Sequence, residues 1–220
     1  IKITAAGGVL SNTNAGVGQQ LTDDELRAIV SAARSLGRKV AAHAHAADGI
    51  NAALKAGVNS IEHGSFLDET SVKLFKENNA YLVPTLLAGV WLGEEMGQND
   101  QIPTAIIDKI NFVIPAVEKS FRLAVDNDVK IAFGTDSGVS KHGENAREFE
   151  LMVKYGMSPT EAIASATRSA ADLLGMSDRL GTLETGKIAD IVATDADPTK
   201  NISELKNITF VMKEGTVYKN

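Results

Sequence analysis

Five side chains of types that could bind a metal ion lie on or follow short apolar runs of the sequence. His43 and His45 end one run, His63 ends the next, Asp136 ends a later one, and Lys2 lies in the first. Neutral imidazoles and a carboxylate are a common ligand set for Zn²⁺ and similar ions. A lysine ammonium has no lone pair, but CO₂ converts a free lysine amine to a carbamate, an anionic oxygen ligand that can bridge two cations. The residue types therefore indicate a metal site.

Each of these residues also has a simpler interpretation when it is taken alone. A single histidine on a strand is more often a hydrogen-bonded core residue than a ligand. Lys2, within Ile-Lys-Ile, would be an edge charge that faces solvent, and the Gly-Thr-Asp-Ser-Gly segment around Asp136 would be a turn. Only the combination of lysine, histidines and aspartate on four strands favours the metal site.

Short apolar runs alternate with amphipathic segments along most of the chain. The expected strands are 1–4, 39–44, 58–64, 80–87 and 129–138. The expected helices are 22–36, 46–57, 67–79, 103–127, 145–156 and 158–175, with loops at 5–20 and after residue 87. This alternation predicts βα units and a parallel sheet, in which functional residues gather at the carboxyl ends of the strands. Five strands cannot close an eight-stranded barrel, but they can form its second half.

The sequence changes character after Gly175. The stretches GTLETGKIADIVATDADP and ITFVMKEGTVYKN are typical of strands joined by tight turns, with little helix. We therefore predict a barrel portion over residues 1–175, which carries the metal site, and a small β-element over residues 176–220.

Composition excludes several classes of protein. The chain has 220 residues, of which 44% are hydrophobic and 23% charged, and its net charge of −6 argues against nucleic acid or an anionic membrane as a partner. It has no cysteine, so disulfides and thiolate ligands are excluded. We find no apolar stretch of membrane-spanning length and no signal peptide. These features are compatible with a cytoplasmic protein. The chain opens at Ile1 inside an expected strand, so we expect an excerpt of a longer protein, and secretion stays open if an amino-terminal leader is missing.

Four segments together resemble the amidohydrolase superfamily. They are IKI, VAAHAHAADGINAALKAGVNSIEHGSFLD, IAFGTDSG with the following HGENAREFELMVKYGMSPTEAIASAT, and LGTLETGKIADIVATDADP. They are similar to its branch of imidazolonepropionase-like and Xaa-Pro dipeptidase (prolidase)-like metal-dependent hydrolases. The resemblance implies an α/β fold: strands four to eight of a distorted (β/α)₈ TIM-like barrel, followed by strands of a small β-sandwich.

The resemblance also implies roles for individual residues. Lys2 would be a carbamylated ligand, and His43, His63 and Asp136 would complete a site for one or two Zn²⁺ ions. Asp136 would also be the catalytic residue, moving a proton while a metal-activated hydroxide cleaves an amide or other C–N bond. His45 would be a second-layer residue, a substrate contact or a loop residue.

The loop after strand 129–138 is where we expect a substrate carboxylate to bind. Lys141 and His142 would contact it, with Asn145 or Arg147 in support, unless this is simply a solvated loop. The expected substrate is a dipeptide or another small amide.

One departure from the family leaves a second hypothesis open. The family has a His-x-His ligand pair on the first barrel strand, and no such pair precedes Lys2. The alternative is a catalytically incomplete fragment or subunit, whose open strand edges would favour self-association into a homo-oligomer. A phosphate-binding barrel is disfavoured, because FGTDSGVS is a poor match to the glycine-rich phosphate-binding loops of such barrels.

Overall fold

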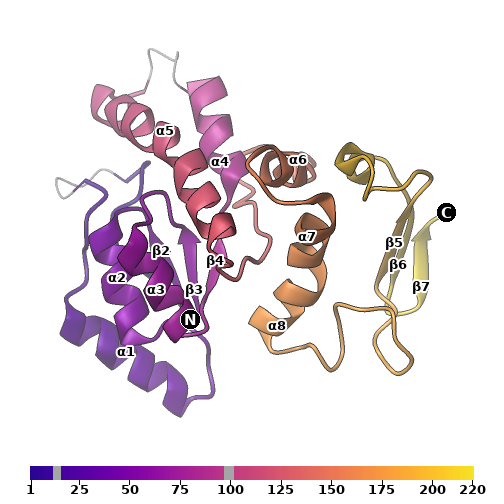
Figure 1. Ribbon diagram of the computed structural model, residues 1–220, viewed down its shortest axis with the longest axis horizontal. Helices are drawn as coiled ribbons and strands as arrows, with labels where there is room; N and C mark the ends of the chain where they lie inside the picture. The colour runs from indigo at the N-terminus through magenta and orange to yellow at the C-terminus, as the bar shows by residue number, and fades with distance from the viewer. Residues whose placement is uncertain (12–15, 97–101) are drawn as a thin grey trace.

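The computed structural model describes residues 1–11, 16–96 and 102–220 (Figure 1). Its main sheet is parallel and has the strand order β1-β2-β3-β4. The strands are β1 (Lys2–Thr4), β2 (Ala41–Ala44), β3 (Ser60–His63) and β4 (Tyr81–Val83). The predicted parallel α/β sheet is thus confirmed.

Three helices cover one face of this sheet, as Figure 1 shows: α1 (Asp23–Ser35), α2 (Ala47–Ala56) and α3 (Glu69–Glu77). The sequence starts α1 and α3 with capping boxes, in which Thr22 and Asp68 accept hydrogen bonds from backbone amides of the first turn. Buried Leu26 and Ile50 belong to the core between helices and strands. With one face buried under helices, the other is left for the polar residues of the site.

Two expected elements differ from the structure. The segment 129–138 makes only a single bridge to β4, between Ile131 and Leu82, since Pro84 has no N–H with which to continue the ladder beyond it. The expected loop after residue 87 is instead helical, with α4 (Leu86–Trp91) followed by a π-helical turn, η1 (Leu92–Met96). Residues 12–15 and 97–101 of the expected loops lie outside the described residues.

Further helical segments follow η1 along the chain as far as Gly175. They are α5 (Thr104–Asp126), α6 (Arg147–Lys154), α7 (Pro159–Ala164), the π-helical η2 (Ser165–Ser169) and α8 (Ala170–Leu174). Gly175 ends α8 in a left-handed conformation, as glycine commonly does after a helix.

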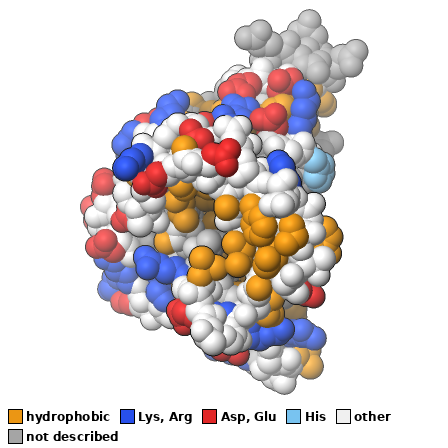
Figure 2. Space-filling view, turned by 90° about the vertical axis from the view of Figure 1, so that its right-hand side faces the viewer, with side chains coloured by type: hydrophobic (Ala, Val, Ile, Leu, Met, Phe, Trp, Pro, Cys, Tyr) orange, Lys and Arg blue, Asp and Glu red, His pale blue; other side chains and the backbone are white. Residues whose placement is uncertain are grey.

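A second, antiparallel sheet follows, with the order β5 (Ile191–Thr194), β6 (Ile208–Lys213) and β7 (Thr216–Lys219). It is joined to α6 through the short helix η3 (Ile202–Lys206), where Ser203 and Lys206 both contact Glu150, at 2.6 Å each. Figure 2 views the molecule from this end and shows hydrophobic side chains gathered on it, and Val192 and Tyr218 are among the exposed apolar residues. In the part of the chain that the structure describes, no helix has both the length and the apolar character to cross a membrane.

Candidate functional site

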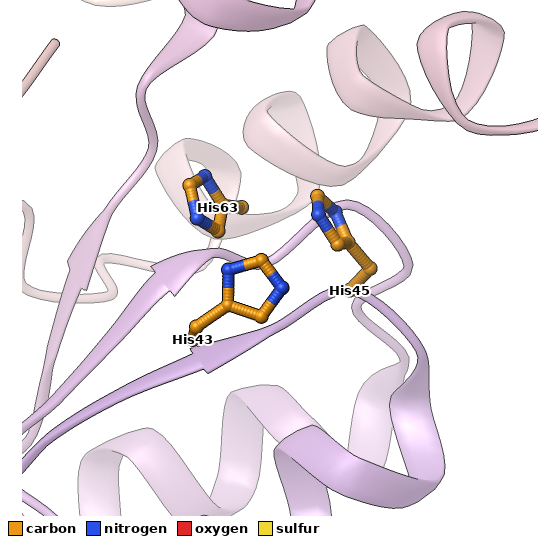
Figure 3. Close-up of side chains that lie close together, drawn as sticks. All are labelled: His43, His45 and His63. Atoms are coloured by element: carbon orange, nitrogen blue, oxygen red, sulfur yellow. The ribbon is translucent and has the colours of Figure 1, made fainter. Parts of the chain in front are cut away.

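Three imidazoles meet at the carboxyl ends of β2 and β3 (Figure 3). His43 lies in β2, His45 directly follows it, and His63 is the last residue of β3. One ring nitrogen of each lies within 4.8 Å of a ring nitrogen of the others. The ring centroids are 4.5 Å apart for His43 and His63, and 4.8 Å and 4.9 Å from His45 to those two rings. Such a cluster could hold a metal ion.

The register of the sheet explains why His43 faces away from the helices. Thr4, His43 and Glu62 are neighbours in register, and paired residues of a parallel sheet share a face. By the same alternation His63 would point to the opposite face, since it is paired with Ala44. His63, however, has φ 74°, a left-handed conformation that breaks the alternation and brings its ring against His43.

Hydroxyl groups orient two of the rings. The Nδ1 atom of His45 lies 2.8 Å from Ser65 Oγ, and Nδ1 of His63 lies 2.7 Å from Thr85 Oγ1. These bonds leave Nε2 of each ring for another partner, the arrangement that metal-binding histidines use. His43 Nε2 is buried and has no hydrogen-bond partner among the described residues. An unsatisfied buried nitrogen beside two oriented imidazoles fits a metal ligand set.

Burial keeps the three rings neutral. Desolvation lowers the pKa of His45 to about 3, and the charge of His43 acts in the same direction. Burial likewise lowers the pKa of His63 well below its usual value, and that of His43 to a smaller extent. A neutral imidazole has the lone pair that a metal ion requires, so at neutral pH the cluster is in its ligating form.

The cluster opens into a cavity of about 300 Å³. Asp136, Ser65 and Thr85 line it together with the three histidines. The rest of the lining is mainly apolar: Val9, Leu10, Pro84, Ala88, Leu92, Val113, Ile114, Val117 and Val139. The arrangement is a small polar base under apolar walls, which is typical of sites for small molecules.

Asp136 lies in the same cavity and is held by its neighbours. It has φ 52°, an uncommon conformation for a residue other than glycine. The side-chain amide of Asn145 donates to Thr135 Oγ1 at 2.9 Å and to Ser137 Oγ at 2.8 Å, on both sides of Asp136. The negative charge of Asp136 also acts to raise the pKa of His43, so the two groups interact.

Lys2 faces the same side of the sheet as His43 but does not line this cavity. It is paired in register with Ala41, one pleat before His43, and its Nζ lies 3.8 Å from Glu62 Oε2. Its side chain is 55% exposed. The Lys2 ammonium is a secondary cause of the lowered pKa of His43 and His63. The carbamylated ligand role of Lys2 stays a prediction.

Lys141 and His142 lie outside the cavity lining. Both are exposed, and Lys141 Nζ lies 5.2 Å from the ring centroid of Trp91. Arg147, expected to support them, instead pairs with Glu94 at 3.1 Å. Their contact with a substrate carboxylate therefore stays a prediction.

Glu148 is completely buried and was not among the residues predicted from the sequence. Its carboxylate accepts hydrogen bonds from the backbone amides of Leu86, at 2.8 Å, and Leu87, at 2.6 Å. Burial raises the pKa of Glu148 to about 8, against the opposing effect of the two amides. One signal was present: Glu148 lies three, four and seven residues before the apolar Leu151, Met152 and Tyr155, on the buried stripe of α6.

Comparisons with known proteins agree with this fold. The model of the family described as "Amidohydrolase family" matches residues 1–218. Ochratoxinase of Aspergillus niger is 34% identical over 225 residues, covering 100% of this chain and 46% of its own length. Imidazolonepropionase of Thermoplasma volcanium is 34% identical over 103 residues, which is 44% of this chain and 26% of that protein.

Solved structures give the same result. The crystal structure of a Xaa-Pro dipeptidase with bound methionine in the active site superposes with a TM-score of 0.97 at 46% identity, covering 100% of this chain and 54% of that one. The chain thus spans about half the length of the proteins that it resembles. Since the family model covers nearly all of the sequence and the α/β fold matches these barrel enzymes, the chain belongs to the amidohydrolase family.

Proposed function

We propose that this chain supplies part of the active site of a metal-dependent hydrolase that cleaves an amide or other C–N bond. The observation that carries the proposal is the cluster of His43, His45 and His63, whose ligand atoms lie within 4.8 Å of one another beside Asp136. Family membership supports it, as does the similarity to proteins named ochratoxinase and Xaa-Pro dipeptidase.

The residues present fit one or two divalent ions, with Zn²⁺ as the expected metal. His43, His63 and Asp136 would hold the ions, joined by Lys2 if its amine is carbamylated. An ion bound there would supply Lewis acidity toward the scissile carbonyl and would lower the pKa of water toward 7. The neutral state of the buried histidines favours this binding, because no proton has to leave them first.

Asp136 and His45 have separate roles in the proposal. The Asp136 carboxylate would accept a proton as water attacks the carbonyl and would then deliver it to the leaving nitrogen. His45 is fixed by Ser65, so its Nε2 would contact either the substrate carbonyl or an ion. His45 is buried, whereas Asp136 is exposed at the mouth of the cavity that both residues line.

The cavity walls favour a substrate with an apolar group. Val9, Leu92, Val113 and Val117 would pack against an apolar side chain, and a cavity of about 300 Å³ suits a dipeptide or a similarly small amide. Lys141 and His142, at the loop after Asp136, would meet the substrate carboxylate.

One observation favours the second hypothesis, an incomplete catalytic unit. The Lys2 side chain is 55% exposed and paired with Glu62, whereas a carbamylated ligand is expected to be buried among metal ions. On this hypothesis the 220 residues bind an ion weakly and hydrolyse nothing without a further polypeptide segment.

Elemental analysis of alanine variants tests the metal site. Purified protein is loaded with Zn²⁺, desalted and analysed. We expect bound zinc in the parent protein and a marked loss of zinc in His43→Ala, His63→Ala and Asp136→Ala. The control Asp195→Asn, which changes an exposed carboxylate just after β5, should lose no zinc. Unchanged zinc content in all three variants would contradict the proposal.

Hydrolysis assays separate the two hypotheses. A panel of dipeptides with apolar and charged side chains is offered to the 220-residue chain and to a longer protein that includes it. Turnover of apolar dipeptides by the longer protein alone supports the incomplete unit, and turnover by both supports a self-sufficient chain.

A further inference from the structure

Glu148 holds the start of α4, at the carboxyl end of β4. Each of its carboxylate oxygens accepts one amide, from Leu86 and Leu87, at 2.8 Å and 2.6 Å. These are the first two amides of α4, which have no partner within the helix itself. A buried carboxylate on α6 thus fixes where α4 begins.

The residue immediately before these amides contacts the histidine cluster. Thr85 has φ 48°, a left-handed conformation that is rare for a β-branched residue, and its hydroxyl lies 2.7 Å from His63 Nδ1. His63 is itself left-handed, with φ 74°. Such backbone conformations are strained and persist only where the surroundings fix them. For Thr85, the bonds from Glu148 to the next two residues are part of that constraint.

The same turn of the chain also contacts the other side of the site. Asn145 donates to Thr135 and Ser137, the two neighbours of Asp136, and its carbonyl accepts from the amide of Glu148 at 3.1 Å. Two residues only three positions apart, Asn145 and Glu148, therefore reach both the segment that contacts His63 and the segment that holds Asp136.

We infer that Asn145 and Glu148, the α6 brace, are positioning residues that set the orientation of the His63 ring and of the Asp136 carboxylate relative to each other. The brace does not line the cavity, and acts through Thr85 on one side and through Thr135 and Ser137 on the other. Its importance for catalysis rests on the proposed function, but its effect on the His63 ring does not.

The first test uses metal-free protein and the ring nitrogens of the histidines, observed by long-range ¹H–¹⁵N NMR. Glu148→Gln keeps the shape of the side chain but places an amide NH₂ against a backbone N–H. We expect the His63 signals to shift toward a mixture of tautomers, as in Thr85→Val, while Thr85→Ser keeps the parent signals. The His45 signals, set by Ser65, serve as an internal reference.

The matched control is Glu150→Gln, the same substitution two residues further along α6, where the carboxylate contacts Ser203 and Lys206. The inference would be overturned if the His63 signals of Glu148→Gln matched those of the parent protein. It would also be overturned if Glu150→Gln shifted the His63 signals by the same amount. If Glu148→Gln does not fold, as judged by circular dichroism, Glu148→Asp takes its place, since it keeps the carboxyl group but cannot reach both amides.

The second test measures Zn²⁺ affinity by competition with a chelator. Removing partners of metal ligands typically lowers affinity about 10- to 100-fold, and we expect this range for Glu148→Gln and for Thr85→Val. Because both substitutions act on His63, the Zn²⁺ affinity of the double variant should be little lower than that of the weaker-binding single variant. Fully additive losses of Zn²⁺ binding free energy would contradict the inference that Glu148 acts on His63 through Thr85. If the parent binds no zinc, the proposed function fails, and the ring spectra still decide the inference.

Discussion

Ser65 Oγ lies 2.8 Å from Nδ1 of His45, and both residues are buried. Ser65→Ala would leave that nitrogen without its partner, at a cost of about 1–3 kcal/mol for a buried polar group. We expect a loss of this size in the free energy of unfolding, measured by urea titration of metal-free protein. Ser35→Ala, which removes a hydroxyl from the exposed surface of α1, should change little. Equal stability of the two variants would contradict the expectation.

The stability of the metal-free protein should fall in acid because of the histidine cluster. The unfolded chain protonates its histidines below about pH 6.5, whereas burial lowers the pKa of His45 in the folded protein to about 3 and also lowers that of His63. Between these values the unfolded state binds more protons, so the free energy of unfolding decreases as the pH falls. Urea titrations from pH 7.5 to pH 4 should show this decrease, with a shallower slope in His45→Gln. Identical slopes would exclude His45 as a source.

Gly8 limits the space beside His43. A Cβ atom at Gly8 would lie 3.3 Å from His43 Nε2 and 2.9 Å from Ser11 Oγ. Gly8→Ala should therefore weaken Zn²⁺ binding severalfold, measured by chelator competition. Gly89→Ala is the matched control, because Gly89 also lines the cavity but its Cβ would meet only Val117, at an ordinary 3.7 Å. An unchanged affinity in Gly8→Ala would show that His43 Nε2 faces no ion.

Gly49 allows α2 to pack on the segment after β1. A Cβ atom at Gly49 would lie 2.6 Å from the Cβ of Ala6, which is completely buried. Overpacking of this kind costs about 1–3 kcal/mol, so Gly49→Ala should lower the free energy of unfolding even though alanine favours a helix. Ala6→Gly in the same chain should restore part of the loss, and no rescue would mean that the clash is relieved elsewhere.

Carbamylation of Lys2 can be observed directly. Protein prepared with ¹³C-bicarbonate and Zn²⁺ should show a carbamate carbon signal by NMR, absent from Lys2→Arg. Glu62→Gln should increase the signal, because the Glu62 carboxylate, 3.8 Å from Lys2 Nζ, would repel a carbamate anion. A signal that survives in Lys2→Arg would assign the carbamate to another lysine.

Much of the architecture could be predicted from the sequence, because it depends on local patterns. The βα alternation and the capping boxes at Thr22 and Asp68 are signals of that kind, and histidines at two successive strand ends were enough to expect a cluster. The face that His63 occupies was not predictable, since alternation gives the wrong side and only its left-handed backbone corrects it.

Features that depend on distant segments were also missed. The start of α4 at Leu86 is stabilised by Glu148, 62 residues further along the chain, so local propensity could not show it. The segment after Lys130 has the composition of a strand, yet pairs with β4 at Ile131 alone. In both cases tertiary contacts decide the backbone conformation.

The attachment of η3 to α6 has a consequence for how the molecule melts. Glu150 binds Ser203 and Lys206 of η3, and it lies on the same short helix as Glu148. Heating that detaches the antiparallel sheet would free one side of α6, and the cavity would lose its shape in the same event. Calorimetry should therefore record one cooperative endotherm rather than two.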